Sequence, residues 1–292
     1  PLSSNAELPL HENYSELIVG ESISRLIGKG FLSKATTYSY DVSLHSLKVG
    51  INGDYTVSSS EKLYGNFFMQ EKLLYAYEQK ARGTKTLIFN NGINTSKQVY
   101  QMFREAGYEI RHLDNTHSET ERQEILAWFR EKPDAILSSV SILTTGFDEP
   151  TVQTIILNRA TKSLTLYHQM IGRGSRVLDE KKTFSVLDLG NNVSRFGLWT
   201  DDVDWQLIFK NPSYFLENLI SDDEIERNFK YEMPDNIKEM FSKSNDFVFN
   251  VQKEYKEAMN NGEKSKVVLE KSIAQHAKIC AENSEDVFDA HI

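Results

Sequence analysis

The chain has 292 residues, of which 39% are hydrophobic and 26% are charged. This composition is typical of a globular protein and, with 15 glycines and 6 prolines, excludes collagen-like and low-complexity chains. The single cysteine, Cys280, excludes an internal disulfide, and no apolar run approaches the roughly 20 residues that span a bilayer. The first residues have no signal-peptide pattern, so we expect a cytoplasmic protein without a membrane segment.

The formal charge of −9 is carried by one part of the chain. Residues 1–200 contain 22 acidic and 22 basic side chains, whereas residues 201–292 contain 20 acidic and 11 basic ones. A neutral body can still carry a local basic groove, because phosphate affinity depends on where lysines and arginines lie. The acidic excess after residue 200 favours a protein partner for that region over a nucleic acid.

The first 80 residues contain no strand-helix-strand pattern of their own. Glu16 to Ile27 is predicted as a short helix that ends at Gly28 and Gly30, and Thr36 to Val49 as an extended segment. Glu61 to Lys80 is predicted as one long amphipathic helix. Residues 1–80 are therefore interpreted as a linker or arm that follows another domain.

From Lys85 onward, short apolar runs alternate with amphipathic stretches. Five strands are predicted: Lys85 to Asn90, Tyr108 to Leu113, Ala135 to Ser139, Thr154 to Leu157 and Phe184 to Leu187. Helices are predicted from Thr95 to Ala106, from the capping box at Ser118 and Glu121 to Pro133, and from Leu164 to Ile171 with Ser163 as the N-cap. Residues 81–200 are thus predicted to form an α/β domain, a parallel sheet with helices on both faces.

Residues 201–292 are predicted to be a mostly helical C-terminal region. The clearest helical segments are Lys253 to Met259 and Lys264 to Ala281.

The most informative stretch is Gln169-Met170-Ile171-Gly172-Arg173-Gly174-Ser175-Arg176. Two arginines three residues apart would lie on one face at the end of a helix. Paired guanidinium groups form a fork for a phosphate group, because arginine donates several hydrogen bonds in a plane and stays charged. The alternative is a solvated basic helix end that complements the helix dipole.

Gln169, Gly172, Arg173 and Arg176 resemble the Gln-x-x-Gly-Arg-x-x-Arg signature of the second RecA-like domain of superfamily 2 helicases. Upstream, Thr144 to Pro150 resembles helicase motif V, and Leu87 to Asn91 resembles motif IV. Residues 158–168 are similar to a segment of the DEAD/DEAH-type bacterial branch related to excision-repair helicases. The resemblance covers residues 85–200 well and residues 1–80 more loosely.

This resemblance implies a role for each matching residue. Arg173 and Arg176 would be arginine fingers that reach the γ-phosphate of ATP, and Gln169 would hold the nucleotide or the attacking water. Asp148 would accept a hydrogen bond from a ribose hydroxyl, while Gly146 and Gly172 would let the backbone approach the nucleotide. Each residue has an ordinary alternative as a turn, cap or surface residue.

Contacts to a DNA or RNA backbone are expected from loops that follow the strands. Asn91, Ser139 and Thr144 lie in the matching loops, although each is equally well explained as an ordinary polar loop residue. Where the family often has a His-Gly pair, this chain has Asp114-Asn115-Thr116-His117, which puts a phosphate contact there in doubt.

The sequence has neither a Gly-x-x-x-x-Gly-Lys-Ser/Thr loop nor an acidic pair after an apolar strand. ATP and Mg²⁺ are therefore expected to be held mainly by an N-terminal RecA-like domain, and the isolated chain is expected to lack ATPase activity. Its start at Pro1 suggests a truncation after that domain.

The histidines show no ligand spacing with a cysteine or carboxylate cluster, so no metal site is predicted. Two alternatives stay open: an inactive nucleic-acid-binding or scaffolding module, and a free-standing doubly wound enzyme that binds a small ligand.

Overall fold

The computed structural model describes residues 10–140, 143 and 147–227. Its strands are β1 (Lys34–Ser39), β2 (Thr86–Asn90), β3 (Ile110–Leu113), β4 (Ile136–Val140), β5 (Thr154–Asn158) and β6 (Thr183–Asp188). Its α-helices are α1 (Ile23–Gly28), α2 (Val57–Tyr64), α3 (Phe67–Lys80), α4 (Ile93–Glu105), α5 (Glu119–Glu131), α6 (Leu164–Gly172), α7 (Asn192–Phe196), α8 (Trp205–Lys210), α9 (Pro212–Glu217) and α10 (Asp222–Arg227). A short 3-10 helix, η1, covers Leu10–Glu12.

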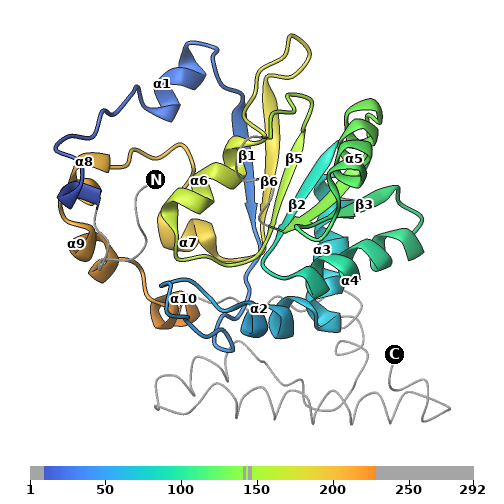
Figure 1. Cartoon of the computed structure of the whole chain (residues 1–292), viewed down its shortest axis with the longest axis horizontal. Helices are drawn as coiled ribbons and strands as arrows, with labels where there is room; N and C mark the ends of the chain where they lie inside the picture. Colours follow the sequence, from blue (N-terminus) through green and yellow to red (C-terminus); the bar gives the residue numbers. More distant parts are fainter. Residues whose placement is uncertain (1–9, 141–142, 144–146, 228–292) are drawn as a thin grey trace, which may run out of the picture. The chain divides into compact units, whose positions relative to one another are not determined.

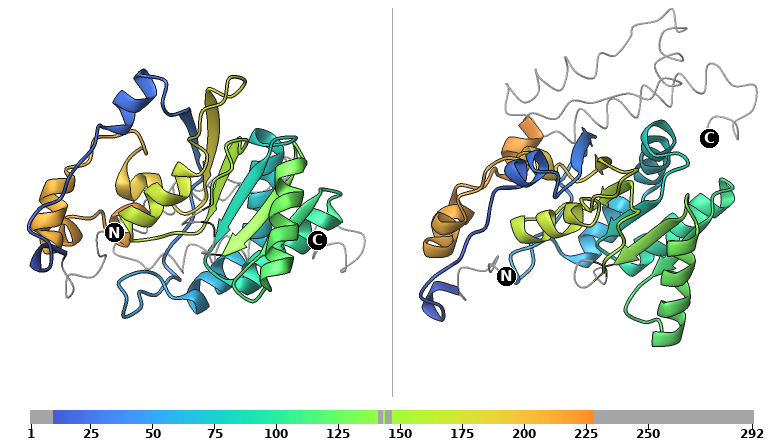
Figure 2. Two further views of the ribbon diagram at one scale, coloured as in Figure 1. Left: turned by 45° about the horizontal axis from the view of Figure 1, so that its top comes forward. Right: turned by 90° about the horizontal axis from the view of Figure 1, so that it is seen from above.

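The six strands form one parallel sheet in the order β1-β6-β5-β2-β4-β3 (Figure 1). The central strands β2 and β5 are buried along their whole length, as expected when helices cover both faces. One hydrophobic core lies between the sheet and α3 and α4, and a second lies between the sheet and α5 and α6 (Figure 2). The predicted α/β class, with helices on both faces of a parallel sheet, is confirmed.

The arm before residue 80 takes part in the sheet. β1 pairs with β6 from Lys34 to Ser39, so the sheet has a sixth strand that the pattern of apolar runs did not reveal. The predicted single helix from Glu61 to Lys80 is wrong. The structure has α2 and α3 instead, because Gly65 ends the first helix and the Asn66 side chain accepts the Met69 N–H at 2.9 Å to begin the second.

The first predicted helix is also shorter than expected. It begins at Ile23 rather than near Glu16, because the Ser22 hydroxyl accepts the Arg25 N–H and caps it there. It ends as predicted, at Gly28, and Gly30 follows with a φ of 78°. The capping box of Ser118 and Glu121 at the start of α5 is confirmed.

Helices α8 to α10 contact the earlier part of the chain. Arg195 on α7 and Tyr55 in the arm both bind the Asp222 carboxylate, and the Glu226 carboxylate accepts the Leu44 N–H. The predicted helices Lys253 to Met259 and Lys264 to Ala281 lie outside the described residues. Within the described part of the chain, no helix has the length and apolar character needed to cross a membrane.

Candidate functional site

Arg173 and Arg176 lie on a turn that directly follows α6. The helix begins at Ser163, whose hydroxyl accepts the Leu166 N–H, and its last residue is Gly172. Arg173 caps the helix and Arg176 lies beyond it, so the prediction that both share a helical face is wrong. The reason is a series of tighter turns, in which the N–H groups of residues 173–175 each bond to the carbonyl three residues earlier.

The backbone of this turn is held in place from two sides. The Lys181 ammonium is buried and donates to the carbonyls of Gly174, Arg176 and Pro150 at 2.8, 2.7 and 2.9 Å. Ser33, which precedes β1, donates its hydroxyl to the Arg176 carbonyl at 2.9 Å and its N–H to the Ser175 carbonyl at 2.7 Å. The arginine turn therefore has a fixed backbone at the amino-terminal ends of β1, β5 and β6.

Both guanidinium groups face the loop that contains Asp148. Arg176 Nε donates to Asp148 Oδ1 at 3.0 Å, and Arg173 donates to the Phe147 carbonyl. The side chains of Arg176 and Asp148 are 54% and 68% exposed, so their ion pair is open to solvent. Burial lowers the pKa of Arg173, and the adjacent Arg176 charge lowers it further, while Asp148 opposes both effects. Two like charges with one carboxylate between them leave this surface suited to an anion.

The structure supports the other residues predicted to contact the nucleotide to different degrees. Gln169 lies half-buried on α6. At Gly172 an added Cβ would meet no atom within 4 Å, so the fold itself does not require glycine there. At Gly174 the same atom would collide with the Phe184 ring. Gly146, like Thr144, lies outside the described residues.

The two described residues predicted for nucleic-acid contact have structural partners. The Asn91 amide donates to the Tyr55 carbonyl at 3.3 Å and to the Ser60 hydroxyl at 2.8 Å, which fastens the arm to the end of β2. Ser139 is fully buried and donates its hydroxyl to the Ile88 carbonyl at 3.3 Å. A buried hydroxyl offers no contact to a surface phosphate, so the prediction for the Ser139 side chain is not supported.

The helix that follows Asn91 also has an occupied N-terminus. Glu61 on α2 accepts the backbone N–H and the side-chain amide of Asn94, both at 3.0 Å. Helix N-termini attract anions through free N–H groups and the helix dipole. At α4 a carboxylate of the chain already fills that position.

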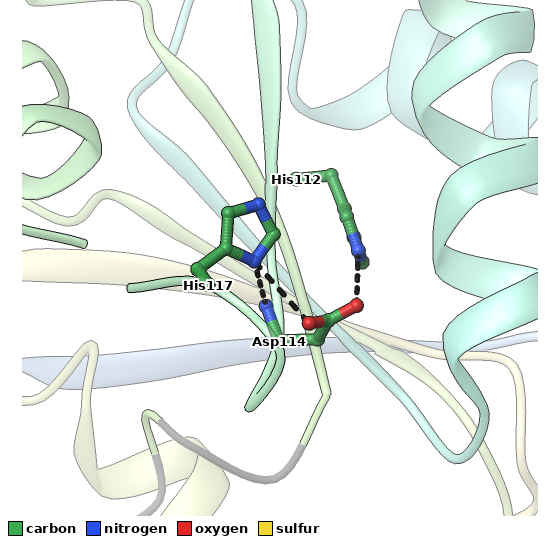
Figure 3. A group of neighbouring side chains, drawn as sticks. All are labelled: His112, Asp114 and His117. Carbon is green, nitrogen blue, oxygen red and sulfur yellow. Dashed lines mark hydrogen bonds and ion pairs between the residues drawn. The ribbon is translucent and has the colours of Figure 1, made fainter. Parts of the chain in front are cut away.

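The expectation that no histidines group with a carboxylate is wrong. His112, Asp114 and His117 come together at the end of β3, and each offers a ligand atom within 4.8 Å of the others (Figure 3). The spacing His-x-Asp-x-x-His after a strand was the available signal in the sequence.

Comparison with known proteins covers the stretch of the chain that contains the arginine turn and the Asp148 loop. Residues 68–177 match the family described as helicase conserved C-terminal domain. This stretch of the chain is similar to helicase C-terminal domains. The match spans β2 to β5, the Asp148 loop and both arginines, and it confirms the resemblance to the second RecA-like domain of superfamily 2 helicases.

Two curated relatives extend beyond the stretch that they share with this chain. A 51.5 kDa protein of Lactococcus phage (isolate 7-9) is 28% identical over 200 residues, which are 68% of this chain and 44% of that protein. A Schizosaccharomyces pombe protein named as a mitochondrial ATP-dependent helicase, irc3, is 32% identical over 124 residues, 42% of this chain and 20% of that protein. The chain spans less than half the length of either relative.

Among solved structures, the chain is similar to the ATP-dependent type ISP restriction-modification enzyme LlaBIII bound to DNA. The two are 17% identical with a TM-score of 0.45, over 62% of this chain and 13% of that enzyme.

Proposed function

We propose that this chain is the C-terminal half of an ATP-dependent nucleic-acid helicase or translocase, and that Arg173 and Arg176 are its arginine fingers. One observation carries the proposal. The two guanidinium groups lie on a turn whose backbone Lys181 and Ser33 hold in place, and both face the partly exposed Asp148 loop. Fixed cations at an open surface are what a phosphate held by a neighbouring domain requires.

The chemistry follows from phosphoryl transfer. Negative charge spreads over the γ-phosphate oxygens in the transition state, and a positioned arginine stabilises it. Such an arginine contributes about 10³ to 10⁵ in rate. Arg176 is the more exposed of the two arginines. Within the described residues, its side chain bonds to the exposed Asp148 alone, so it can exchange that partner for a phosphate.

The residues fit ATP but not Mg²⁺. Bound ATP would supply the phosphoryl group and a ribose, with Arg173 and Arg176 toward the phosphates and Asp148 toward the ribose hydroxyl. Glu149, the other carboxylate of the loop, is 6% exposed and accepts both the Thr151 N–H and its hydroxyl. It is therefore not free to hold Mg²⁺, and we assign the magnesium and the phosphate-cradling loop to another RecA-like domain.

Nucleic acid, either DNA or RNA, is the proposed substrate of the complete enzyme. Asn91 stays a candidate contact through its half-buried position at the carboxyl end of β2, and Thr144 stays a prediction from sequence. A protein partner for residues 201–292 and a cytoplasmic location are likewise predictions from sequence.

The test is phosphate release in the presence of single-stranded DNA or RNA. The isolated chain is expected to release none above background. Joined to a first RecA-like domain with the Gly-x-x-x-x-Gly-Lys-Ser/Thr loop, it should turn over ATP, and Arg176→Ala should lower that rate about 1,000-fold. Arg176→Lys should recover only part of the loss, because lysine is a point charge without the planar fork.

Arg82 is a matched control, because it is also an exposed arginine of the same domain. Arg82→Ala is expected to leave the rate unchanged. Equal rates in the Arg176→Ala and unmodified proteins would instead favour a binding or scaffolding module, in which the substitution changes affinity but no rate.

A further inference from the structure

A cluster of two histidines and one aspartate lies at the edge strand of the sheet, apart from the arginine turn. His112 lies in β3, Asp114 directly follows the strand, and His117 ends the turn before the Ser118 cap of α5. Residues two apart on an extended chain point to the same side, which places His112 and Asp114 together. The turn then brings His117 back to the same carboxylate.

Both imidazole rings are directed at Asp114, as Figure 3 shows. His112 Nε2 lies 2.8 Å from Asp114 Oδ2, and His117 Nδ1 lies 3.2 Å from Asp114 Oδ1. The ring centres are 5.5 Å apart. Two imidazole nitrogens and the Asp114 carboxylate thus lie within 4.8 Å of one another, and the Asp114 N–H also donates to His117 Nδ1 at 3.2 Å.

Contacts from neighbouring residues orient the ligand atoms. The Ser96 hydroxyl on α4 lies 2.7 Å from His112 Nδ1, so the other nitrogen of the ring is turned to the cluster. The N–H and hydroxyl of Thr116 both bond to Asp114 Oδ1, at 2.7 and 2.6 Å, which leaves Oδ2 toward His112. Metal sites in proteins characteristically have such supporting hydrogen bonds behind their ligands.

We propose that His112, Asp114 and His117 form a binding site for a divalent transition-metal ion of the zinc class. Two imidazoles and a carboxylate are a donor set that zinc accepts, with a water molecule in the fourth position. Magnesium prefers an all-oxygen octahedral set and binds imidazole poorly. The chemistry therefore separates this ion from the Mg²⁺ that accompanies ATP.

The site is open to solvent on one side. Side-chain exposure falls from 21% at His117 to 9% at His112 and 0% at Asp114. Both histidines line a groove of about 820 Å³ between α4, β3 and α5, which gives an ion a way in. Lys97 and Arg111 also line this groove, so the positive surroundings do not attract cations in general. Binding must come from the nitrogen ligands themselves, which again favours a zinc-class ion.

Ion binding would have a mechanical consequence. His117 adjoins the N-cap of α5, and His112 contacts Ser96 on α4, so one ion would link the edge strand to the helices on both faces of the sheet. An ion at concentration c that binds only the folded chain stabilises it by RT ln(1 + c/Kd), so the melting temperature rises with the logarithm of the ion concentration once that exceeds the dissociation constant. This inference does not depend on the proposed helicase function.

The experiment uses the full chain after removal of metals with a chelator. Co²⁺ is titrated and followed by its visible absorption, and Zn²⁺ affinity is measured by competition with a chromophoric chelator. We expect a Co²⁺ spectrum with nitrogen ligation that Zn²⁺ abolishes and a large excess of Mg²⁺ leaves unchanged. Zn²⁺ should also raise the melting temperature. Displacement of Co²⁺ by Mg²⁺, or no Co²⁺ spectrum at all, would overturn the proposal.

Variants locate the ion. His117 is partly exposed, so His117→Gln should fold normally and weaken Zn²⁺ binding by at least about 10-fold, the lower end of the effect of removing even a supporting residue. Ser96→Ala removes the hydroxyl that contacts both His112 Nδ1 and the Ser138 hydroxyl, and it should weaken binding about 10-fold to 100-fold. The exposed His45 is the control, and His45→Gln should have no effect. Zn²⁺ affinity that is equal in the unmodified chain and His117→Gln would refute this site.

Discussion

The parallel strands all end at one side of the sheet, here called the carboxyl edge, and all begin at the opposite side, the amino edge. Polar side chains have different roles at these two edges. At the carboxyl edge, a continuous series of hydrogen bonds joins Asn158, Asn90, Ser138, Ser96 and His112, with every member buried or nearly so. At the amino edge, buried groups hold only the backbone of the arginine turn, and the guanidinium of Arg176 lies in solvent. The buried series at the carboxyl edge joins strands β5, β2 and β4 to helix α4 and ends at His112, whereas Arg176 at the amino edge presents its charge to solvent.

The largest loss of stability at the amino edge is expected from removal of the Lys181 ammonium. Lys181→Met keeps the apolar length of the side chain but leaves the Pro150 and Gly174 carbonyls without this donor. Burial already lowers the pKa of Lys181 to about 8, so its desolvation offsets part of the gain from the three bonds. We expect a loss of about 3 kcal/mol in the free energy of unfolding, measured by urea denaturation.

Lys182 is the matched control, since its side chain is 63% exposed and it neighbours Lys181 in sequence. Lys182→Met should change stability by less than about 0.5 kcal/mol. If both lysine variants were equally stable, the ammonium would not hold the turn, and the contrast between the two edges would lose its basis.

Much of the fold could be predicted from sequence because buried parallel strands are continuous apolar runs. The strands β2 to β6 were all found in this way. β1 was missed as a member of the sheet because Lys34 to Ser39 is a polar, partly exposed segment that pairs with β6 alone. The break at Gly65 and Asn66 was missed although a glycine followed by an N-cap residue signals it.

The chemistry of the site was predicted more fully than its support. Arg173, Arg176 and Asp148 were named from their order in the sequence, and the structure brings them together. The residue that holds Arg176 from the arm, Ser33, is 143 positions away, and no local pattern predicts such a pairing. The burial of Ser139 could not be predicted either, because the sequence does not show whether a serine at the end of a strand faces solvent or the core.

Substitution of the two glycines next to the arginines tests packing and function separately. Gly174→Ala pushes a methyl group against Phe184 and Ile155, so the free energy of unfolding should fall by about 2 kcal/mol. Gly172→Ala has open space and lies in a helix, so stability should rise by about 0.5 kcal/mol. Thermal or urea unfolding of both variants measures the difference.

ATP turnover is expected to respond to these two substitutions differently from stability. If Gly172 faces the nucleotide, as proposed, Gly172→Ala should lower ATP turnover of the two-domain protein while the chain stays stable. Turnover unaffected by that methyl group would remove Gly172 from the nucleotide site and leave it as an ordinary helix end.

Helix α6 (Leu164–Gly172) runs between the two edges, and it contains a pH-sensitive residue at His168. Its ring packs edge-on against Tyr167 and Trp205, and burial lowers its pKa to about 4. The unfolded chain binds a proton near pH 6.5, so between pH 6.5 and 4 the unfolded state holds more protons than the folded state. Stability should therefore fall with pH in this window, by about 1 kcal/mol at pH 5 after allowance for partial solvent contact.

His168→Phe should remove that part of the pH dependence, because phenylalanine retains the aromatic contacts and has no proton to bind. Carboxylates titrate in the same window, so the quantity that matters is the difference in slope between the variant and the unmodified chain from pH 7 to 5. A His168→Phe slope equal to that of the unmodified chain would mean that the His168 imidazole keeps its ordinary pKa, and that α6 is more open to water than its ring packing indicates.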